Sequence, residues 1–359
     1  MLAQDRQAGS SELIIEPEVI ARVDEMLTQM TRDGTFTGSV LIAQDGNILL
    51  SQGYGLADRA QGIPNTPRTR FRIASVSKQF TAMAILILQF RGKLNVQDPI
   101  CNYIAGCPAA WQDITIHHLL THTSGLSSER SSERYQSNDS STGELGMPSD
   151  PAYFLGLEPA LPLDTRPGEQ FAYNNLGYIL LAHIIEQVSG QSYAGLLEKA
   201  IFTPLDMHNT GYEDRSSGLS AGYADRDALS AASRVWLPIS DGAGRLFSSV
   251  EDLFLWDQAL YTDRLLPRTE LDRMFEPYVR ESNYPGFGYG YGWFVGNDRG
   301  RPVTAHSGEG AGFTSLIMRY PKDGLNGIVL INQWDIESIP IWAAISSVLF
   351  GEGQSLPIG

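Results

Sequence analysis

The sequence is poor in cysteine, in positive charge and in long apolar runs. Of its 359 residues 26 are Lys or Arg and 41 are Asp or Glu, so the formal net charge is −15. This balance, without any Lys/Arg-rich run, argues against nucleic acid and anionic membrane surfaces as partners. The longest apolar run near a helix, AMAILILQF (82–90), is far shorter than the roughly 20 residues that span a bilayer. We therefore predict no transmembrane segment.

The two cysteines, Cys101 and Cys107, lie close together in CNYIAGCPAAW. The spacing is equally compatible with a small disulfide loop, which would imply an oxidising compartment, and with two free thiols. No second Cys or Cys/His pair accompanies them, so a zinc site is not expected. Residues 1–18 lack a charged segment followed by an apolar one, so no signal peptide is visible.

What the sequence does contain is the composition of a soluble globular protein, with 42% hydrophobic and 19% charged residues. Pro17 and Gly34 mark the ends of an amphipathic helix over 16–34. Residues 38–58 predict two strands joined at Asp45-Gly46, a strong hairpin signal. Residues 75–210 are mainly helical, with helices predicted from 75 to 92, over 115–125 and over 174–190.

Strands return after residue 210, in GYGYGWFVG and over 301–331, and a helix is predicted over 340–351. Ser249 followed by Asp252 marks the start of another helix. The order favours an α+β fold, in which an antiparallel sheet is flanked by N- and C-terminal helices around an inserted helical domain. We expect a sheet domain of 16–74 plus 211–359, a helical domain of 75–210, and an active site at their interface. The Ser-rich segment 127–146 is expected to be a loop.

A candidate nucleophile lies at the start of the helix predicted after residue 74. In RIASVSKQFTAM, Ser75 and Lys78 are three residues apart and share a helix face, whereas Ser77 points elsewhere. A serine hydroxyl needs a positioned base and donors for the developing oxyanion, and the free N–H groups of a first helical turn favour negative charge. However, Ser-x-x-Lys occurs by chance about once in a chain of this length.

Two further segments carry residues with suitable chemistry. Tyr173 and Asn175 stand before the apolar helix of FAYNNLGYILLAHIIE, where polar side chains can project into a cleft. His306 and Gly308 lie in AHSGEGAGF, in a predicted strand followed by glycines, and Gly308 would let a ligand lie close to the backbone.

Ser75-Val-Ser-Lys78, Tyr173-Asn-Asn175 and His306-Ser-Gly308 resemble the three ordered motifs of serine β-lactamases and penicillin-binding proteins. The flanking segments HHLLTHTSGL, SSVEDLFLWDQAL and YGYGW are also similar to that family. The resemblance implies that Ser75 is acylated and that Lys78 and Tyr173 share the general-base and proton-shuttle work. It also implies substrate binding by Asn175, His306, Ser307 and Gly308, and an oxyanion hole made by the backbone N–H groups of Ser75 and Glu309.

Two departures favour one branch of the family. His306 stands where most β-lactamases have Lys, and no separate Glu-bearing loop of the class A type is evident. The pattern therefore resembles class C β-lactamases, D-Ala-D-Ala carboxypeptidases and related esterases. A carboxylate anchored by His306 would need an imidazolium, so carboxylate-bearing substrates should bind worse as pH rises past the ordinary His pKa of ~6.5.

The resemblance thus implies a cofactor-free and metal-free serine hydrolase acting on D-amino-acid peptides or β-lactams, with a small-molecule or peptide substrate as its partner. It also suggests an extracytoplasmic location, with the signal peptide absent from this sequence. The alternatives are a carboxylesterase on the same scaffold, and a penicillin-binding or scaffold protein without turnover. A metal site at His118 and His122, one helical turn apart, is disfavoured because no H-E-x-x-H pattern exists.

Overall fold

The central layer of the molecule is an antiparallel sheet of eight strands, in the order β2-β1-β13-β12-β11-β10-β9-β8. The computed structural model describes residues 13–127, 163–212, 218–227, 241–280, 286–310 and 312–351. The strands of this sheet are β1 (Gly38–Gln44), β2 (Asn47–Tyr54), β8 (Val279–Arg280), β9 (Gly288–Tyr289), β10 (Phe294–Asp298), β11 (Arg301–Gly310), β12 (Phe313–Tyr320) and β13 (Leu325–Ile331).

Two small sheets lie beside the large one. One pairs β3 (Leu56–Asp58) with β4 (Ile63–Pro64), and the other has the order β5 (Phe71–Arg72), β7 (Leu246–Ser248), β6 (Gly211–Tyr212). The described helices are α1 (Pro17–Arg32), α2 (Lys78–Phe90), α3 (Ile116–Leu120), α6 (Asn175–Ser189), α7 (Tyr193–Leu197), α8 (Val250–Ala259), α9 (Arg268–Leu271) and α10 (Ser338–Phe350). Short turns of 3₁₀-helix include η1 (Ala74–Ser77), η2 (Ile100–Asn102), η3 (Ala109–Trp111), η5 (Thr203–Leu205) and η6 (Asp272–Phe275), and Glu198–Phe202 forms a π turn.

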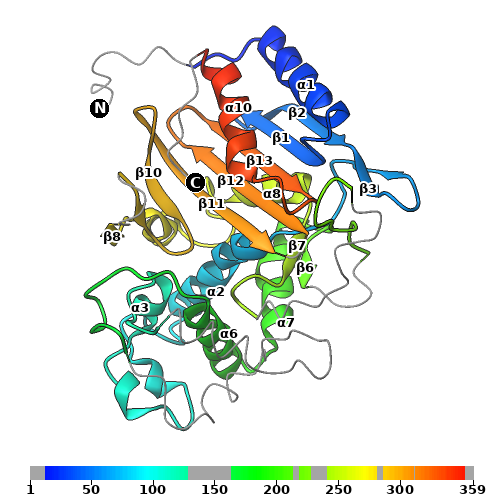
Figure 1. The fold of residues 1–359 in the computed structure, drawn as a ribbon. Coiled ribbons are helices and arrows are strands. Elements are labelled where there is room, and N and C mark those ends of the chain that lie inside the picture. The colour runs from blue at the N-terminus through cyan, green and yellow to red at the C-terminus, as the bar shows by residue number, and fades with distance from the viewer. Residues whose placement is uncertain are drawn as a thin grey trace, which may run out of the picture.

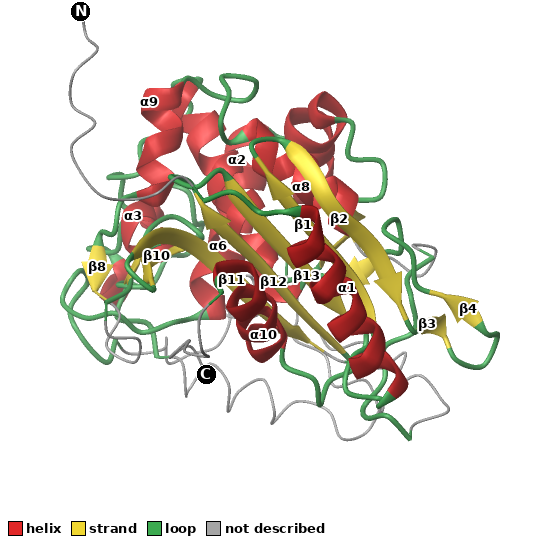
Figure 2. Cartoon of the chain, turned by 90° about the horizontal axis from the view of Figure 1, so that it is seen from above, coloured by secondary structure: helices red, strands yellow, loops and turns green. Residues whose placement is uncertain are grey.

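Helices cover both faces of the sheet. Figures 1 and 2 show α1 and α10 on one face and α8 on the other, with α2, α3 and α6 grouped beyond the end of β11. Every residue of β12 and β13 is buried, as expected for strands enclosed on both faces. The predicted α+β fold class, with terminal helices flanking an antiparallel sheet, is confirmed.

The predicted hairpin over 38–58 is also confirmed. Gln44 pairs with Asn47, which leaves Asp45 and Gly46 as a two-residue loop. Both loop residues have positive φ, 49° and 77°, as a type I′ turn requires. The two-residue loop sets the pairing next to the turn, and the register shifts between Ile42 and Ala43 further along the hairpin.

Two predicted boundaries are wrong. The helix expected to run to Gly125 ends at Leu120, because His122 adopts a left-handed conformation with φ 56°. The strand expected in GYGYGWFVG is divided into β9 and β10, since Gly292 between them has φ 78°. Both interruptions are local changes of backbone conformation that hydrophobic periodicity does not report.

The main core does not separate at the predicted domain boundary. One continuous cluster contains Leu41 and Ile317 from the sheet together with Phe80 of α2 and Ile184 of α6. A second cluster fills the space between the other face of the sheet and α1 and α10. The division into 16–74 plus 211–359 and 75–210 therefore stays a prediction. Residues 128–146 of the predicted Ser-rich loop lie outside the described residues.

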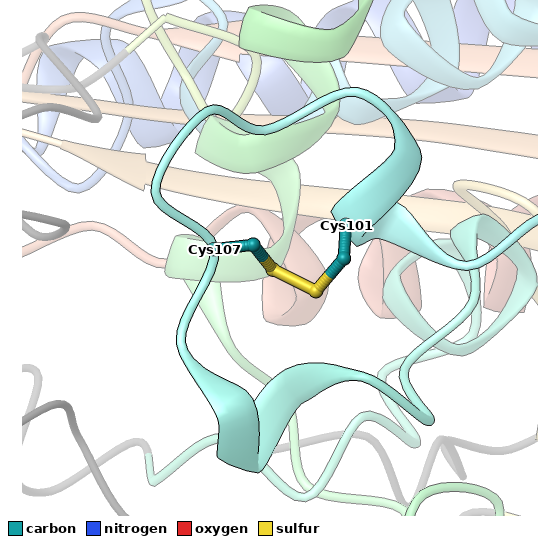
Figure 3. The surroundings of a disulfide bond; sticks show 2 residues. All are labelled: Cys101 and Cys107. Atoms are coloured by element: carbon teal, nitrogen blue, oxygen red, sulfur yellow. A yellow bond between two sulfur atoms is a disulfide. The ribbon is translucent and has the colours of Figure 1, made fainter.

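Cys101 and Cys107 form a disulfide, six residues apart in the sequence (Figure 3). It closes the loop between η2 and η3 and packs against the main core. Of the two possibilities left open by the spacing, the structure has the disulfide. Within the described residues, no helix combines the length and the apolarity needed to cross a bilayer.

Candidate active site

Ser75 lies in the tight turn η1, between strand β5 and helix α2. The turn begins with Ala74 at φ 43°, a strained conformation for a residue with a side chain. Because residues i and i+3 eclipse in a 3₁₀ turn, Ser75 and Lys78 meet directly. The Nζ atom of Lys78 lies 3.0 Å from Oγ of Ser75. The geometry that selected Ser75 over Ser77 is present, although it comes from a 3₁₀ turn and not from the α-helix.

The side chain of Lys78 is fully buried and is surrounded by oxygen atoms. Besides Ser75, Nζ contacts Oδ1 of Asn175 at 2.8 Å and the carbonyl oxygen of Ala243 at 2.9 Å. Burial lowers the pKa of Lys78 well below its ordinary value of 10.5. The charged amine would donate to all three oxygens. In its neutral form the amine would donate its two N–H groups to Asn175 and Ala243 and direct its lone pair toward the hydroxyl of Ser75.

Tyr173 reaches the same point from the segment before α6. Its hydroxyl shares a hydrogen bond with the Ser75 side chain, and its ring centroid lies 4.8 Å from Nζ of Lys78. Burial outweighs that hydrogen bond and raises the pKa of Tyr173 above 10, so the side chain is a neutral phenol near pH 7. Asn175 is the first residue of α6, whose N-cap is Asn174. Ser75, Lys78, Tyr173 and Asn175 are thus brought together as predicted from the sequence.

The strand β11 packs against η1 from the other side. A Cβ atom on Gly308 would lie 2.4 Å from the carbonyl oxygen of Ile73 and 2.9 Å from the amide nitrogen of Ser75. Gly308 is therefore needed so that the strand and the turn can approach each other, whereas the sequence suggested a close approach of ligand. Residues 306–310 pair with β12 but extend past the residues that pair with β10. Glu309, the exposed residue after Gly308, therefore lies on a strand edge that β10 does not cover.

His306 does not have the environment expected of a carboxylate anchor. It is 2% exposed, its Nδ1–H donates to the carbonyl oxygen of Ser307 at 2.6 Å, and its Nε2 lies 3.0 Å from the hydroxyl of Tyr289. Burial is the main cause that lowers the pKa of His306 to about 3, because desolvation disfavours the charged ring. The pKa shift is opposite to the one that an imidazolium anchor near neutral pH would need, and the anchoring role stays a prediction.

The histidines considered for a metal site are occupied by main-chain contacts. Nδ1 of His118 accepts the N–H of Thr115 at 3.2 Å, and Nδ1 of His122 accepts the N–H of Asn174 at 3.1 Å. In the part of the chain that the structure describes, no group of three or more His, Cys, Asp or Glu side chains could hold a metal ion.

Two contacts at the site were not found from the sequence. The Ala243 carbonyl contacts Lys78 across 165 positions, and a backbone oxygen leaves no side-chain signal. His122 lies against Tyr173, with ring centroids 4.2 Å apart. Its place in HHLLTHTSGL, one of the segments that resemble the family, was the only available signal.

The arrangement of the sheet, η1 and α6 is that of the β-lactamase/transpeptidase-like fold, and the comparisons with known proteins agree. The family model described as Beta-lactamase matches residues 23–344, so the chain belongs to this family. Over 349 residues it is 32% identical to Penicillin-binding protein 4* of Bacillus subtilis (strain 168), covering 90% of this chain and 74% of that protein.

Two further similar proteins extend the comparison. Protein flp of Staphylococcus aureus (strain NCTC 8325 / PS 47) is 29% identical over 330 residues, which are 89% of this chain and 64% of that protein. This chain therefore spans less than two thirds of that relative. The structure of the octameric penicillin-binding protein homologue from Pyrococcus abyssi superposes with a TM-score of 0.80 at 27% identity, covering 93% of this chain and 78% of that one.

Proposed function

We propose that this chain is a serine hydrolase that forms an acyl-enzyme at Ser75, with amide bonds of D-amino-acid peptides or of β-lactams as its substrates. The observation that carries the proposal is the 3.0 Å contact between Nζ of a buried Lys78 and Oγ of Ser75. A neutral amine at this distance is a competent general base for a serine hydroxyl.

In the acylation step, Oγ of Ser75 attacks the substrate carbonyl carbon while its proton passes to Nζ of Lys78. The resulting oxyanion is held by the backbone N–H groups of Ser75 and Glu309. Lys78 then returns the proton, through the Tyr173 hydroxyl, to the leaving nitrogen as the C–N bond breaks. Deacylation repeats these steps with water as the nucleophile, and Ser75 regains its proton. Tyr173 acts as a neutral relay because burial raises its pKa.

The environment of His306 also favours a second candidate, a carboxylesterase. A neutral ring at this position offers no charge to a substrate carboxylate, so substrates without one lose nothing there. Asn175 and the edge of β11 would then hold a neutral acyl group. A protein that is acylated without turnover is the remaining alternative, and it differs only in the deacylation step.

A parallel assay separates these functions. A chromogenic cephalosporin, a short-chain p-nitrophenyl ester and a D-Ala-D-Ala peptide are each tested with wild type, Ser75→Ala and Ser77→Ala. We expect Ser75→Ala to lower kcat about 10³-fold or more on whichever substrate is turned over. Ser77→Ala removes a hydroxyl that accepts the N–H of Leu246, and this variant should stay within about threefold of wild type.

The outcomes of this assay are distinct. Full activity of Ser75→Ala on the working substrate contradicts the proposed mechanism. One equivalent of product per protein without a steady rate identifies a protein that is acylated but does not turn over.

We also infer an extracytoplasmic location and an active site between a sheet domain and a helical domain. The disulfide between Cys101 and Cys107 supports the location, because such bonds persist mainly in oxidising compartments. The meeting of β11 with η1 and α6 at Ser75 supports the placement of the site.

A further inference from the structure

His122 holds the segment of Tyr173 from both sides. Its carbonyl oxygen accepts the N–H of Ala172 at 2.8 Å, and its Nδ1 accepts the N–H of Asn174 at 3.1 Å. The two donors, Ala172 and Asn174, are the residues before and after Tyr173 in the sequence. The left-handed conformation of His122 turns both acceptors, one from the backbone and one from the side chain, toward the same segment.

The imidazole ring of His122 also supports the Tyr173 ring directly. The two ring centroids are 4.2 Å apart, with an interplanar angle of 35°. On its other sides His122 is enclosed by the rings of Tyr178 at 5.1 Å, Tyr289 at 4.7 Å and Phe171 at 5.9 Å. Because close-packed rings have little freedom to move, this contact fixes the direction in which the Tyr173 hydroxyl points.

The hydrogen bonds require one particular form of the ring. A backbone N–H only donates, so Nδ1 of His122 carries a lone pair and the neutral ring carries its hydrogen on Nε2. Among the described residues this Nε2 has no hydrogen-bond partner, and the side chain is 2% exposed. Burying an unpartnered N–H costs free energy, so packing alone would be better served by an apolar ring.

The groups that face His122 keep it in this form. Lys78 and His306 are the other basic groups nearby, and Tyr173, Tyr178 and Tyr289 are phenols with raised pKa values. Burial is the largest cause that lowers the pKa of His122 well below 6.5. A protonated ring would place a hydrogen on Nδ1 and break the contact with Asn174.

We propose that His122 is a positioning residue for the reaction at Ser75, because two hydrogen bonds and one ring contact hold Tyr173 where its hydroxyl meets Ser75. This inference rests on the proposed function, in which Tyr173 relays the proton. In this proposal His122 acts through Tyr173 and does not contact the substrate.

Two substitutions at His122 separate its two contributions. His122→Phe keeps a ring and loses the acceptor, whereas His122→Asn keeps an acceptor in the place of Nδ1 and tolerates a left-handed backbone. The matched control is His118→Asn, since His118 also accepts a backbone N–H through Nδ1 but caps α3 away from Ser75. For each variant, kcat and KM are measured on the substrate turned over by wild type, with kcat normalised to the burst of acyl-enzyme.

We expect His122→Phe to lower kcat by roughly ten- to a hundredfold, with KM within about twofold, as for a misplaced catalytic group. The kcat of His122→Asn should be at least about threefold higher than that of His122→Phe, and His118→Asn should keep the wild-type kcat. A folded His122→Phe with wild-type kcat, or a His122→Asn no better than His122→Phe, overturns the inference.

A second measurement is made on the wild-type protein. Ring ¹⁵N NMR should show a histidine that stays in the neutral Nε2–H form from pH 5 to pH 8, and its signal is assigned to His122 by its absence from the spectrum of His122→Asn. A His122 ring that becomes charged within this range overturns the inference.

Ser75→Ala in the same series keeps the two proposals distinct. If Ser75→Ala is fully active, the proposed function and the inference both fail. If Ser75→Ala is inactive and His122→Phe is normal, the inference fails alone.

Discussion

At the scale of single residues, the site is marked by a buried lysine whose pKa is lowered by desolvation. Lys78 has no exposed surface, and the three atoms that contact its Nζ are uncharged oxygens. A carboxylate at the same place would stabilise the ammonium form and would occupy the lone pair that Ser75 needs. Burying Lys78 lowers the stability of the folded chain, and under the proposed function the lowered pKa lets its amine act as a base.

Replacing Lys78 by methionine should abolish turnover and change how stability depends on pH. Between the lowered pKa of the folded protein and pH 10.5, the unfolded lysine is charged while the folded one is neutral, so each unit by which folding lowers the pKa of Lys78 costs about 1.4 kcal/mol. Wild-type stability therefore falls as the pH drops from 10.5 toward the folded pKa. The gain in unfolding free energy from Lys78→Met should be larger at pH 7 than at pH 10, as measured by urea denaturation.

The comparison between the two pH values tests this interpretation. The variant loses the hydrogen bonds to Asn175 and Ala243 at both pH values, so their contribution to the unfolding free energy cancels in the comparison. Equal differences at pH 7 and pH 10 would mean that Lys78 remains charged in the folded protein.

His306 should not titrate in the range in which most enzymes are assayed. With its pKa lowered to about 3, the ring is neutral throughout pH 5 to 8. We therefore expect KM for a carboxylate-bearing substrate and for a neutral ester to follow parallel curves with pH over this range. If KM for the carboxylate alone rises between pH 6 and pH 7.5, a charged His306 is the anchor after all.

At the scale of secondary-structure elements, the site is the contact of strand β11 with the turn η1. The position of the nucleophile is set by how closely these two backbones approach. Gly308 is the point of contact, because any side chain there would meet Ile73 and the amide of Ser75. Glu309 follows this point of contact, on the strand edge that β10 does not cover.

A methyl group on Gly308 should separate the two elements. Gly308→Ala is expected to lower the rate of acylation roughly a hundredfold, since displacement of about 1 Å costs this much at a reacting centre. Stopped-flow measurement of the acylation burst gives the rate directly.

Gly177→Ala is the matched control, two positions after Asn175 in helix α6. Its Cβ would meet Leu119 at no less than 3.5 Å, an ordinary contact. Alanine favours a helix interior by roughly 0.5–1 kcal/mol over glycine, so this variant should keep its activity and gain stability. A Gly308→Ala protein that is acylated as fast as Gly177→Ala would show that the close approach is not needed.

At the scale of the whole molecule, one core joins the sheet to the helices that carry the site. The cluster that contains Ile317 and Phe80 links β12 to α2 across the predicted domain boundary. The disulfide loop packs on the edge of this cluster, and its two cysteines lie among the partly buried residues. The bond is thus placed to stabilise the chain without contact to Ser75 in the described structure.

Removal of the disulfide should lower stability and leave the chemistry unchanged. Cross-linking residues six apart removes conformational entropy from the unfolded chain that corresponds to about 2 kcal/mol. Cys101→Ser combined with Cys107→Ser should lower the unfolding free energy by about this amount, while kcat normalised to the acylation burst stays within about twofold. A large fall in normalised kcat would show that the loop helps to shape the active site.

The sequence by itself determined the features that depend on local spacing. The turn at Asp45-Gly46 set the hairpin, and three positions in a tight turn brought Ser75 and Lys78 together. The order of the motifs also indicated that Tyr173 and Asn175 belong to the same site. These features were predictable because chain geometry over a few residues, or a resemblance in the motifs, is sufficient to specify them.

Only the tertiary structure decided the charge and the fine position of these groups. Burial lowers the pKa values of Lys78 and His306, and no spacing in the sequence reports burial. The carbonyl of Ala243 and the ring of His122 reach the site from segments 165 and 52 positions away from their hydrogen-bond partners. The physical reason is that desolvation and close packing are sums over neighbours that only the folded chain assembles.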